Sequence, residues 1–193
     1  MAENDLCMYE VIGVFVEQYA GREAREKVME GVEELAGASD ETKSLWVKGA
    51  MERLDELLDE ETAVNVMVGC GHACARINGV AVKMGVEKRM KYGSVEEYLE
   101  AEQRDPIPGT RLEREGDILH QYYMPNTFRE GVRCFCSRIS SLHADQMISP
   151  TYCNCSKGYA EKFWEAVLGR PVKVELVQST MTGADECKFT IHL

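Results

Sequence analysis

The sequence predicts an α+β fold, in which a helical N-terminal half packs on an antiparallel sheet and the chain ends in a helix and a β-hairpin. Apolar residues recur at helical spacing through the first half, whereas the C-terminal segment alternates apolar and polar residues. The 193 residues are 45% hydrophobic, which suffices for one buried core. We therefore expect a single domain over 1–193, mainly helical over 1–103, with the sheet, last helix and hairpin over 117–193.

Three helices are expected in the first sixty or so residues. The first has one apolar face and ends at Gly21. A second covers 22–35 and closes at Gly37, and a third follows Asp40, the expected N-cap. The core-facing stripe of the third helix consists of Val47, Met51, Leu54 and Leu58.

A fourth helix begins at about Glu61 and runs into a segment rich in glycine and cysteine. Gly69 and Gly71 each weaken a helix by about 1 kcal/mol relative to alanine, so we expect a bound ligand or close packing to compensate. Later, a capping-box pattern that starts at Ser94 opens a short helix that runs to Glu102.

The second half begins with an expected surface loop over 104–116, which contains two prolines and mixed charge. Residues 117–124 form a strand, and 126–136 either continue the sheet or leave it. The sequence therefore places the start of the sheet after the loop.

The C-terminal segment has the clearest pattern. Residues 157–168 form a helix with one aromatic and aliphatic face, and Gly169 stands at its C-terminal cap. Alternating residues over 172–178 and 186–193, joined by a glycine-containing turn, predict a β-hairpin.

Charge and cysteine content indicate which partners, compartment and chemistry to expect. A net charge of -11 repels phosphate backbones and anionic membranes, so we expect neither a nucleic-acid nor a membrane partner. The acidic start at Glu3 predicts no signal peptide, and hence a cytoplasmic protein. In that reducing compartment, eight cysteines indicate metal ligation or redox chemistry before disulfides. An exposed apolar helix face in the N-terminal half would allow a homodimer.

Six cysteines form three pairs. Cys70 and Cys74 lie one helical turn apart on one face, and members of a Cys-x-Cys pair in an extended segment point to one side. We expect a subset of the six to bind zinc or an iron-sulfur cluster, with packing or thiol roles as the alternative. Cys7, alone in an apolar helix, is interpreted as a small buried hydrophobe. The six are Cys70, Cys74, Cys134, Cys136, Cys153 and Cys155.

Two further side chains are candidates near these pairs. His72 stands between two cysteines and would be a ligand, a general base beside a thiol, or a histidine that is exposed or structurally hydrogen-bonded. Cys155 precedes Ser156 and Lys157 at the start of the last helix, a position that favours a reactive thiolate, while Ser156 would cap the helix.

Three C-terminal stretches carry a resemblance to known families: Tyr152–Tyr159, Leu168–Leu176 and Gly183–Ile191. They resemble the end of the 4-vinyl-reductase-type ligand-binding domain, and most closely a group of uncharacterised cysteine-rich prokaryotic proteins. The final glycine, cysteine and phenylalanine pattern is similar to that of the 2-amino-thiazoline-4-carboxylate hydrolases.

This resemblance implies an antiparallel sheet with helices packed around it, and a zinc site near the C-terminus. The implied ligands are Cys153 or Cys155, Glu175, Ser179 and Cys187. Ser179 breaks the pattern, because a neutral hydroxyl is a poor zinc ligand. The extra pairs upstream suggest a centre rebuilt with different ligands.

Three functions follow as expectations. The first is a metal-containing binding or sensor module for a small, largely apolar molecule. The second is a metal- or thiol-dependent hydrolase of a small sulfur heterocycle, as the hydrolase resemblance implies. The third is an iron-sulfur or redox protein. The residue pattern does not decide whether the chain is an enzyme.

Overall fold

The computed structural model describes residues 2–143 and 145–193, without the side chains of residues 2–8 and 128. It confirms the α+β class, with helices first and a sheet, a helix and strands at the end. The helices, including short 3-10 helices labelled η, are α1 (Ala2–Ala20), α2 (Arg22–Val28), η1 (Val32–Leu35), α3 (Asp40–Leu57), α4 (Glu60–Ile77), α5 (Val80–Arg89), α6 (Val95–Arg104), α7 (Pro125–Phe128), η2 (Ser137–Ile139), η3 (Pro150–Cys153), α8 (Asn154–Leu168) and η4 (Thr180–Thr182). The strands are β1 (Thr110–Glu115), β2 (Ile118–Tyr123), β3 (Lys173–Gln178) and β4 (Cys187–His192).

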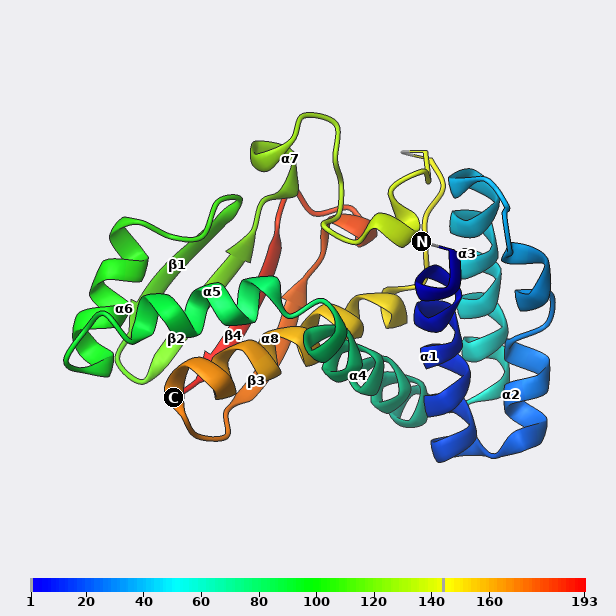
Figure 1. Cartoon of the computed structure of the whole chain (residues 1–193), viewed down its shortest axis with the longest axis horizontal. Helices are drawn as coiled ribbons and strands as arrows, with labels where there is room; N and C mark the ends of the chain where they lie inside the picture. Colours follow the sequence, from blue (N-terminus) through cyan, green and yellow to red (C-terminus); the bar gives the residue numbers. More distant parts are fainter. Residues whose placement is uncertain (1, 144) are drawn as a thin grey trace.

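The four strands form one antiparallel sheet in the order β1-β2-β4-β3. Residue 121 on β2 pairs with residue 189 on β4 at the centre of the sheet. Trp164 of α8 is fully buried and donates from Nε1 to Oε1 of Gln121 at 3.0 Å, which fixes α8 against β2. In Figure 1, α5 and α8 run along the sheet, while α1, α2 and α3 form a layer at the other end.

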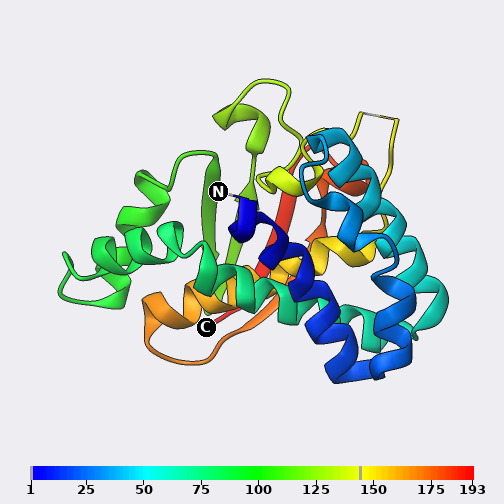
Figure 2. The same ribbon diagram turned by 45° about the vertical axis from the view of Figure 1, so that its right-hand side comes forward.

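Two clusters of buried side chains fill the interior. The helical core lies among α1, α3, α4 and the segment around η2 and η3, and the sheet core lies between the sheet, α6 and α8. Figure 2 shows the two parts on either side of α4 and α8. Large members of the helical core are Val16, Met51, Leu54 and Met67, and those of the sheet core are Tyr98, Leu119, Trp164, Phe189 and Ile191.

The two glycines of α4 allow very close packing, as expected. A Cβ added to Gly71 would lie 2.1 Å from the carbonyl oxygen of Cys155, and one added to Gly158 would lie 2.2 Å from that of Val68. At Gly69, an added Cβ would clash with the ring of Phe15. The backbones of α4 and α8 therefore touch at Gly71 and Gly158, which joins the two cores.

Two helix boundaries in the first half differ from prediction. The helix expected over 22–35 stops at Val28, because Gly31 adopts a positive φ of 77° before η1. Ser39, not Asp40, caps α3, since Ser39 Oγ accepts from the backbone N–H of Thr42 at 3.1 Å. The side chain of Cys7 lies outside the described residues.

Other differences concern the second half. The expected loop over 104–116 contains β1, and residues 126–136 leave the sheet. Helix α5, Val80–Arg89, was not predicted from the sequence. Ser156 is not the cap of α8, because the helix already begins at Asn154. The hairpin pairing, the left-handed Gly169 cap and the Ser94 cap are confirmed.

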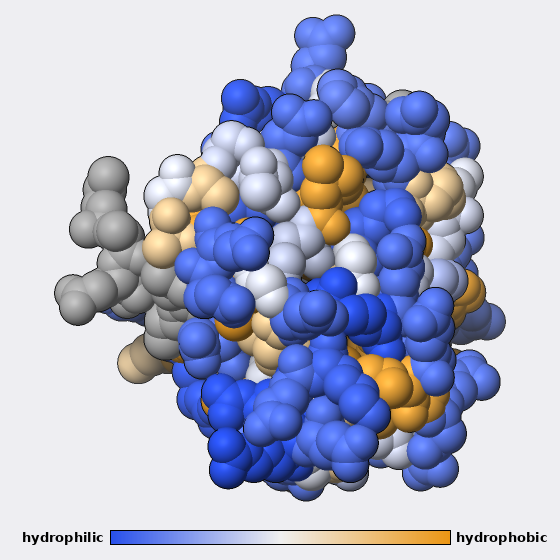
Figure 3. Space-filling model, turned by 90° about the vertical axis from the view of Figure 1, so that its right-hand side faces the viewer, coloured by the Kyte–Doolittle hydropathy of each residue, from blue (hydrophilic) through white to orange (hydrophobic). Residues whose placement is uncertain are grey.

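The surface is mainly polar at the helical end. Figure 3, which views that end, shows small separate hydrophobic patches on a hydrophilic face. In the part of the chain that the structure describes, no helix is long and apolar enough to cross a membrane.

Candidate metal centre

The seven cysteines with described side chains are free thiols that gather where α4, the segment around residue 135, the start of α8 and β4 meet. No disulfide joins any of these seven. Cys70 and Cys153 are buried in the helical core, and three more pack against it: Cys134, Cys136 and Cys155. The fold thus brings together cysteines from four distant positions in the sequence.

Four of these thiols form one group, which we call the quartet: Cys70, Cys74, Cys136 and Cys155. Burial raises the pKa of the Cys155 thiol well above its ordinary value, and the neighbouring Cys136, Cys70 and Cys74 raise it further. Burial likewise raises the pKa of Cys70 to about 12, with a further contribution from Cys74. Without a bound metal, the buried members of the quartet therefore hold their protons at neutral pH.

Arg138 and Tyr152 hydrogen-bond to the quartet. The Arg138 guanidinium donates to Cys136 Sγ at 3.6 Å, and the Tyr152 hydroxyl lies 3.0 Å from the same sulfur. The Arg138 charge also favours the thiolate forms of Cys70 and Cys155, against the effect of burial. Among the described residues no carboxylate forms an ion pair with Arg138, so its nearest anionic groups would be thiolates.

Three other thiols form a second group, which we call the trio: Cys134, Cys153 and Cys187. Cys153 Sγ lies 2.9 Å from Ser179 Oγ, and Cys187 Sγ accepts from the backbone N–H of Thr180 at 3.4 Å. Burial raises the pKa of Cys153 to about 11, although the Ser179 hydrogen bond lowers it. The hydrogen-bond partners of Cys153 and Cys187 are therefore neutral, whereas Cys136 of the quartet is hydrogen-bonded to a cation.

The two Cys-x-Cys pairs differ in how their thiols are placed. Cys153 ends η3 and Cys155 lies in the first turn of α8, and side chains two residues apart in a helix point to nearly opposite sides. Cys134 and Cys136 belong to a loop and stay adjacent, because the backbone N–H of Cys136 donates to Cys134 Sγ at 3.4 Å, and this pair therefore links the two groups. The pair on α4 also stays together, as its spacing predicts.

Two other candidate metal ligands, His72 and Glu175, lie outside both groups of thiols. His72 on α4 is hydrogen-bonded through Nε2 to Oε2 of Glu161 on α8, at 2.8 Å. Glu175 is an exposed residue of β3 whose pKa is lowered by Lys173, through a hydrogen bond and charge, and by His192. The ligand role that the resemblance implies for Glu175 thus has no geometric support.

The positions of these side chains determine whether they can bind a metal ion. Over the described ranges, no group of three or more His, Cys, Asp or Glu side chains has the arrangement that holds one metal ion. The thiols are close enough to affect one another's pKa values, yet they are not gathered into a single coordination shell. Their donor set is nevertheless the soft sulfur set that zinc and iron-sulfur clusters require.

A family model described as a family of unknown function, DUF6144, matches residues 3–193. The chain belongs to this family. The DUF6144 match spans both thiol groups and both cores, so the cysteine centre lies within the family domain. No curated protein matches the chain. The resemblances to the reductase-type domain and to the hydrolases remain predictions.

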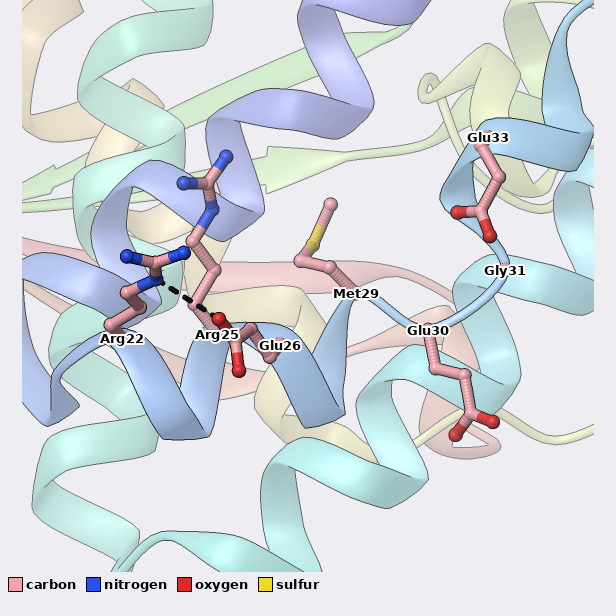
Figure 4. Close-up of a pocket in the computed structure, with 7 residues that line it drawn as sticks. All are labelled: Arg22, Arg25, Glu26, Met29, Glu30, Gly31 and Glu33. Carbon is pink, nitrogen blue, oxygen red and sulfur yellow. Dashed lines mark hydrogen bonds and ion pairs between the residues drawn. The ribbon is translucent and has the colours of Figure 1, made fainter.

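A surface hollow of the DUF6144 domain lies away from the cysteines, over α2 and η1 (Figure 4). Arg22 and Glu26 form an ion pair across 2.9 Å within it, and Arg25 pairs with Glu17 outside it. This hollow is open and charged, so it does not fit the small apolar ligand expected from the sequence. Its lining residues are Arg22, Arg25, Glu26, Met29, Glu30, Gly31 and Glu33.

Sequence reasoning missed Arg138 and Tyr152. Arg138 follows Cys136 by two residues, and Tyr152 directly precedes Cys153. Both adjoin a cysteine pair, which is the only signal that the sequence offers for them. Their hydrogen bonds depend on how the loop before η2 packs against η3, which no local pattern predicts.

Proposed function

We propose that this DUF6144 protein is a metal-binding domain whose centre is formed by the clustered cysteines, with the quartet as its main ligand set. The observation that carries the proposal is the charge of Arg138. This half-buried guanidinium is hydrogen-bonded to a quartet sulfur and has no carboxylate partner in the described part of the chain.

A partly buried cation without a counter-charge loses part of its solvation, which is costly. Burial alone would lower the pKa of Arg138, and the anionic forms of Cys136, Tyr152 and Cys74 raise it instead. Neutral thiols give the guanidinium no such compensation. Metal-bound thiolates do, since metal binding displaces the thiol protons even where burial raises the pKa of the free thiol.

The donor set favours a soft metal. Four thiolates suit zinc or an iron-sulfur cluster, and a site closed by four protein sulfurs is typical of a structural or electron-transfer centre rather than a hydrolytic one. The free state of the seven described thiols is consistent with a reducing, cytoplasmic compartment, which we propose for the protein.

The other expected functions receive less support. A small apolar ligand is not supported by the described hollow, which is charged and lies apart from the thiols. A hydrolase reaction and a homodimer remain predictions.

Metal content tests the proposal. We expect zinc or iron in near-stoichiometric amounts, by elemental analysis, in full-length protein purified without oxygen. Cys70→Ser and Cys155→Ser each remove two thirds of this metal or more, because a hydroxyl is a poor replacement for a thiolate ligand. His72→Gln and Glu175→Gln retain it, because neither side chain lies in a thiol group.

The proposal is wrong if the wild-type protein contains no metal, or if His72→Gln loses as much metal as Cys155→Ser. Far-ultraviolet circular dichroism of each variant, matched to that of the wild type, separates loss of a ligand from loss of folding.

A further inference from the structure

We infer that Cys153 and Cys187 form a redox-active pair of thiols, which a small-molecule disulfide converts into an intramolecular disulfide bond. Neither thiol belongs to the quartet, so this inference goes beyond the metal-binding function proposed above and does not depend on it. The structure shows the reduced form of the pair, because both side chains are free thiols.

A buried hydroxyl lies between the two sulfurs. Ser179 Oγ is 2.9 Å from Cys153 Sγ and 3.9 Å from Cys187 Sγ. The sum of these distances limits the separation of the sulfurs to about 6.8 Å, whereas a disulfide joins them at about 2.05 Å. Ser179 is only 3% exposed and also accepts from the backbone N–H of Met181 at 3.1 Å, so its position is fixed.

The backbone brings the two cysteines to this hydroxyl from different segments. Cys153 ends η3, which packs against η4, the turn that directly follows Ser179. Cys187 begins β4, and the neighbouring Lys188 pairs with Gln178 at the end of β3. A change between staggered rotamers moves a cysteine sulfur by about 3 Å. Rotation of both side chains toward each other therefore spans the gap even at its upper limit.

The exposure of the two thiols sets the order of events. Cys187 is partly exposed, whereas Cys153 is buried in the helical core, so an oxidant in solution reaches Cys187 first. The backbone N–H of Thr180 donates to Cys187 Sγ at 3.4 Å, and the Thr180 hydroxyl donates to the carbonyl of Arg133 at 2.6 Å. These bonds hold Cys187 beside η4, where Cys153 can attack it.

The reaction consists of two thiol-disulfide exchanges. Cys187 loses its proton to solvent and attacks one sulfur of the small disulfide, so a mixed disulfide forms and one small thiolate leaves and takes up a proton. Cys153, as the thiolate, then attacks Cys187 Sγ, the mixed disulfide breaks, and the second small thiol leaves. The protein pair is thereby oxidised by two electrons, and one disulfide is reduced to two thiols.

The new bond joins the two cores. Cys153 belongs to the helical core, and Cys187 packs against the sheet core. A cross-link that closes a long loop restricts the unfolded chain, so we expect the oxidised protein to unfold about 5 °C or more above the reduced protein. In a reducing compartment such a bond forms only transiently, as is typical of thiol pairs that sense oxidants.

The test uses full-length protein, purified without oxygen and treated with excess oxidised glutathione. The remaining thiols are blocked with N-ethylmaleimide, and the protein is digested without reductant for mass spectrometry. We expect peptides linked through Cys153 and Cys187 to be about threefold or more in excess over any other linked pair, and dithiothreitol to separate them.

Single substitutions assign the two roles. Cys153→Ser is expected to leave glutathione attached to Cys187, because the second exchange has lost its nucleophile. Cys187→Ser removes both the mixed and the intramolecular disulfide and abolishes the rise in unfolding temperature. Cys134→Ser is the matched control and keeps the link, because the Cys134 sulfur instead accepts from the backbone N–H of Cys136. Circular dichroism matched to that of the wild type shows that each variant is folded.

Three results would overturn the inference: no linked peptide in excess oxidant, another pair such as Cys134 and Cys136 as the main product, or glutathione that stays on Cys187 in the wild type. A linked protein that unfolds at the same temperature as the reduced protein would overturn the connection of the cores. Metal content is measured separately on the same preparation, so failure of the disulfide and failure of the metal-binding proposal are distinguishable.

Discussion

The helical core and the sheet core differ in what holds them together. The sheet core is formed by large apolar side chains, among which Trp164 and Phe189 are fully buried and the Trp164 indole is hydrogen-bonded to Gln121. The helical core contains thiols and borders a half-buried guanidinium. Both cores are mainly apolar, and the helical core differs in that it contains several free thiols beside a half-buried guanidinium.

Under the proposed function, the two cores differ in how their stability depends on a metal. Burial of apolar area stabilises the sheet core by about 25 cal/mol per Å² whether or not a metal is bound. Under that proposal, the thiolate ligands and Arg138 of the helical core compensate one another only when the metal is present. The following predictions test that contrast, from the largest expected effect to the smallest.

A substitution at the contact between the two cores is expected to give the largest loss of stability. Gly71→Ala places a Cβ 2.1 Å from a backbone oxygen of α8, which has no room to move. We expect a loss of about 4 kcal/mol or more in the free energy of unfolding, measured by urea denaturation, because overpacking against backbone is poorly relieved. Gly49→Ala on α3 is the control. Its Cβ meets only Nη1 of Arg53, at 3.3 Å, and no backbone atom, so we expect that variant to change stability by less than about 1 kcal/mol.

Phe189→Ala tests the sheet core alone. This fully buried residue of β4 packs on Tyr123, with ring centroids 4.8 Å apart, so its loss leaves a cavity. We expect a destabilisation of about 3 to 4 kcal/mol by urea denaturation. The loss is the same with and without metal. A metal-dependent loss at this position would contradict the independence of the two cores.

The response to pH tests the helical core. Burial raises the pKa of the Cys70 thiol from 9.0 to about 12, so in metal-free protein the unfolded chain loses this proton first. Stability is then full below about pH 9 and falls by an amount on the order of 2 kcal/mol by about pH 11. Metal-bound protein shows the opposite sensitivity, because protons compete with the metal in acid. Thermal unfolding across pH, with and without chelator, distinguishes the two.

Substitutions at two helix N-caps are expected to give the smallest losses of stability. Asp59 caps α4, which carries Cys70 and Cys74, and Ser94 caps α6 beside the sheet core. Asp59→Ala and Ser94→Ala each cost about 1 kcal/mol of stability by denaturant titration. Only Asp59→Ala is expected to speed metal transfer to a competing chelator. Equal rates in the two variants would show that the α4 cap does not influence the site.

The sequence predicted parts of the fold that local patterns control. The i to i+4 spacing of Cys70 and Cys74, the Gly169 cap and the C-terminal hairpin all depend on neighbouring residues. Strand β1 was missed because its sequence, Thr-Arg-Leu-Glu-Arg-Glu, has one aliphatic residue and resembles a charged loop. Its pairing with β2 is what makes it a strand.

The candidate site was predicted only as a set of cysteines. Its division into quartet and trio arises because α8 begins before Cys155, which turns that thiol away from Cys153. The role of Arg138 depends on contacts between segments far apart in the sequence, such as α4 and the loop before η2. Spacing within one segment carries no information about those contacts.

Amide hydrogen exchange, followed by mass spectrometry on anaerobic protein before and after metal removal, tests the central claim most directly. The account predicts that removal raises exchange about tenfold or more in the Cys70–Cys74 turn of α4 and in the first turn of α8, while β2 and β4 keep their protection. Unchanged exchange in α4 and α8, or an equal rise in β4, would contradict a metal centre that stabilises the helical core alone.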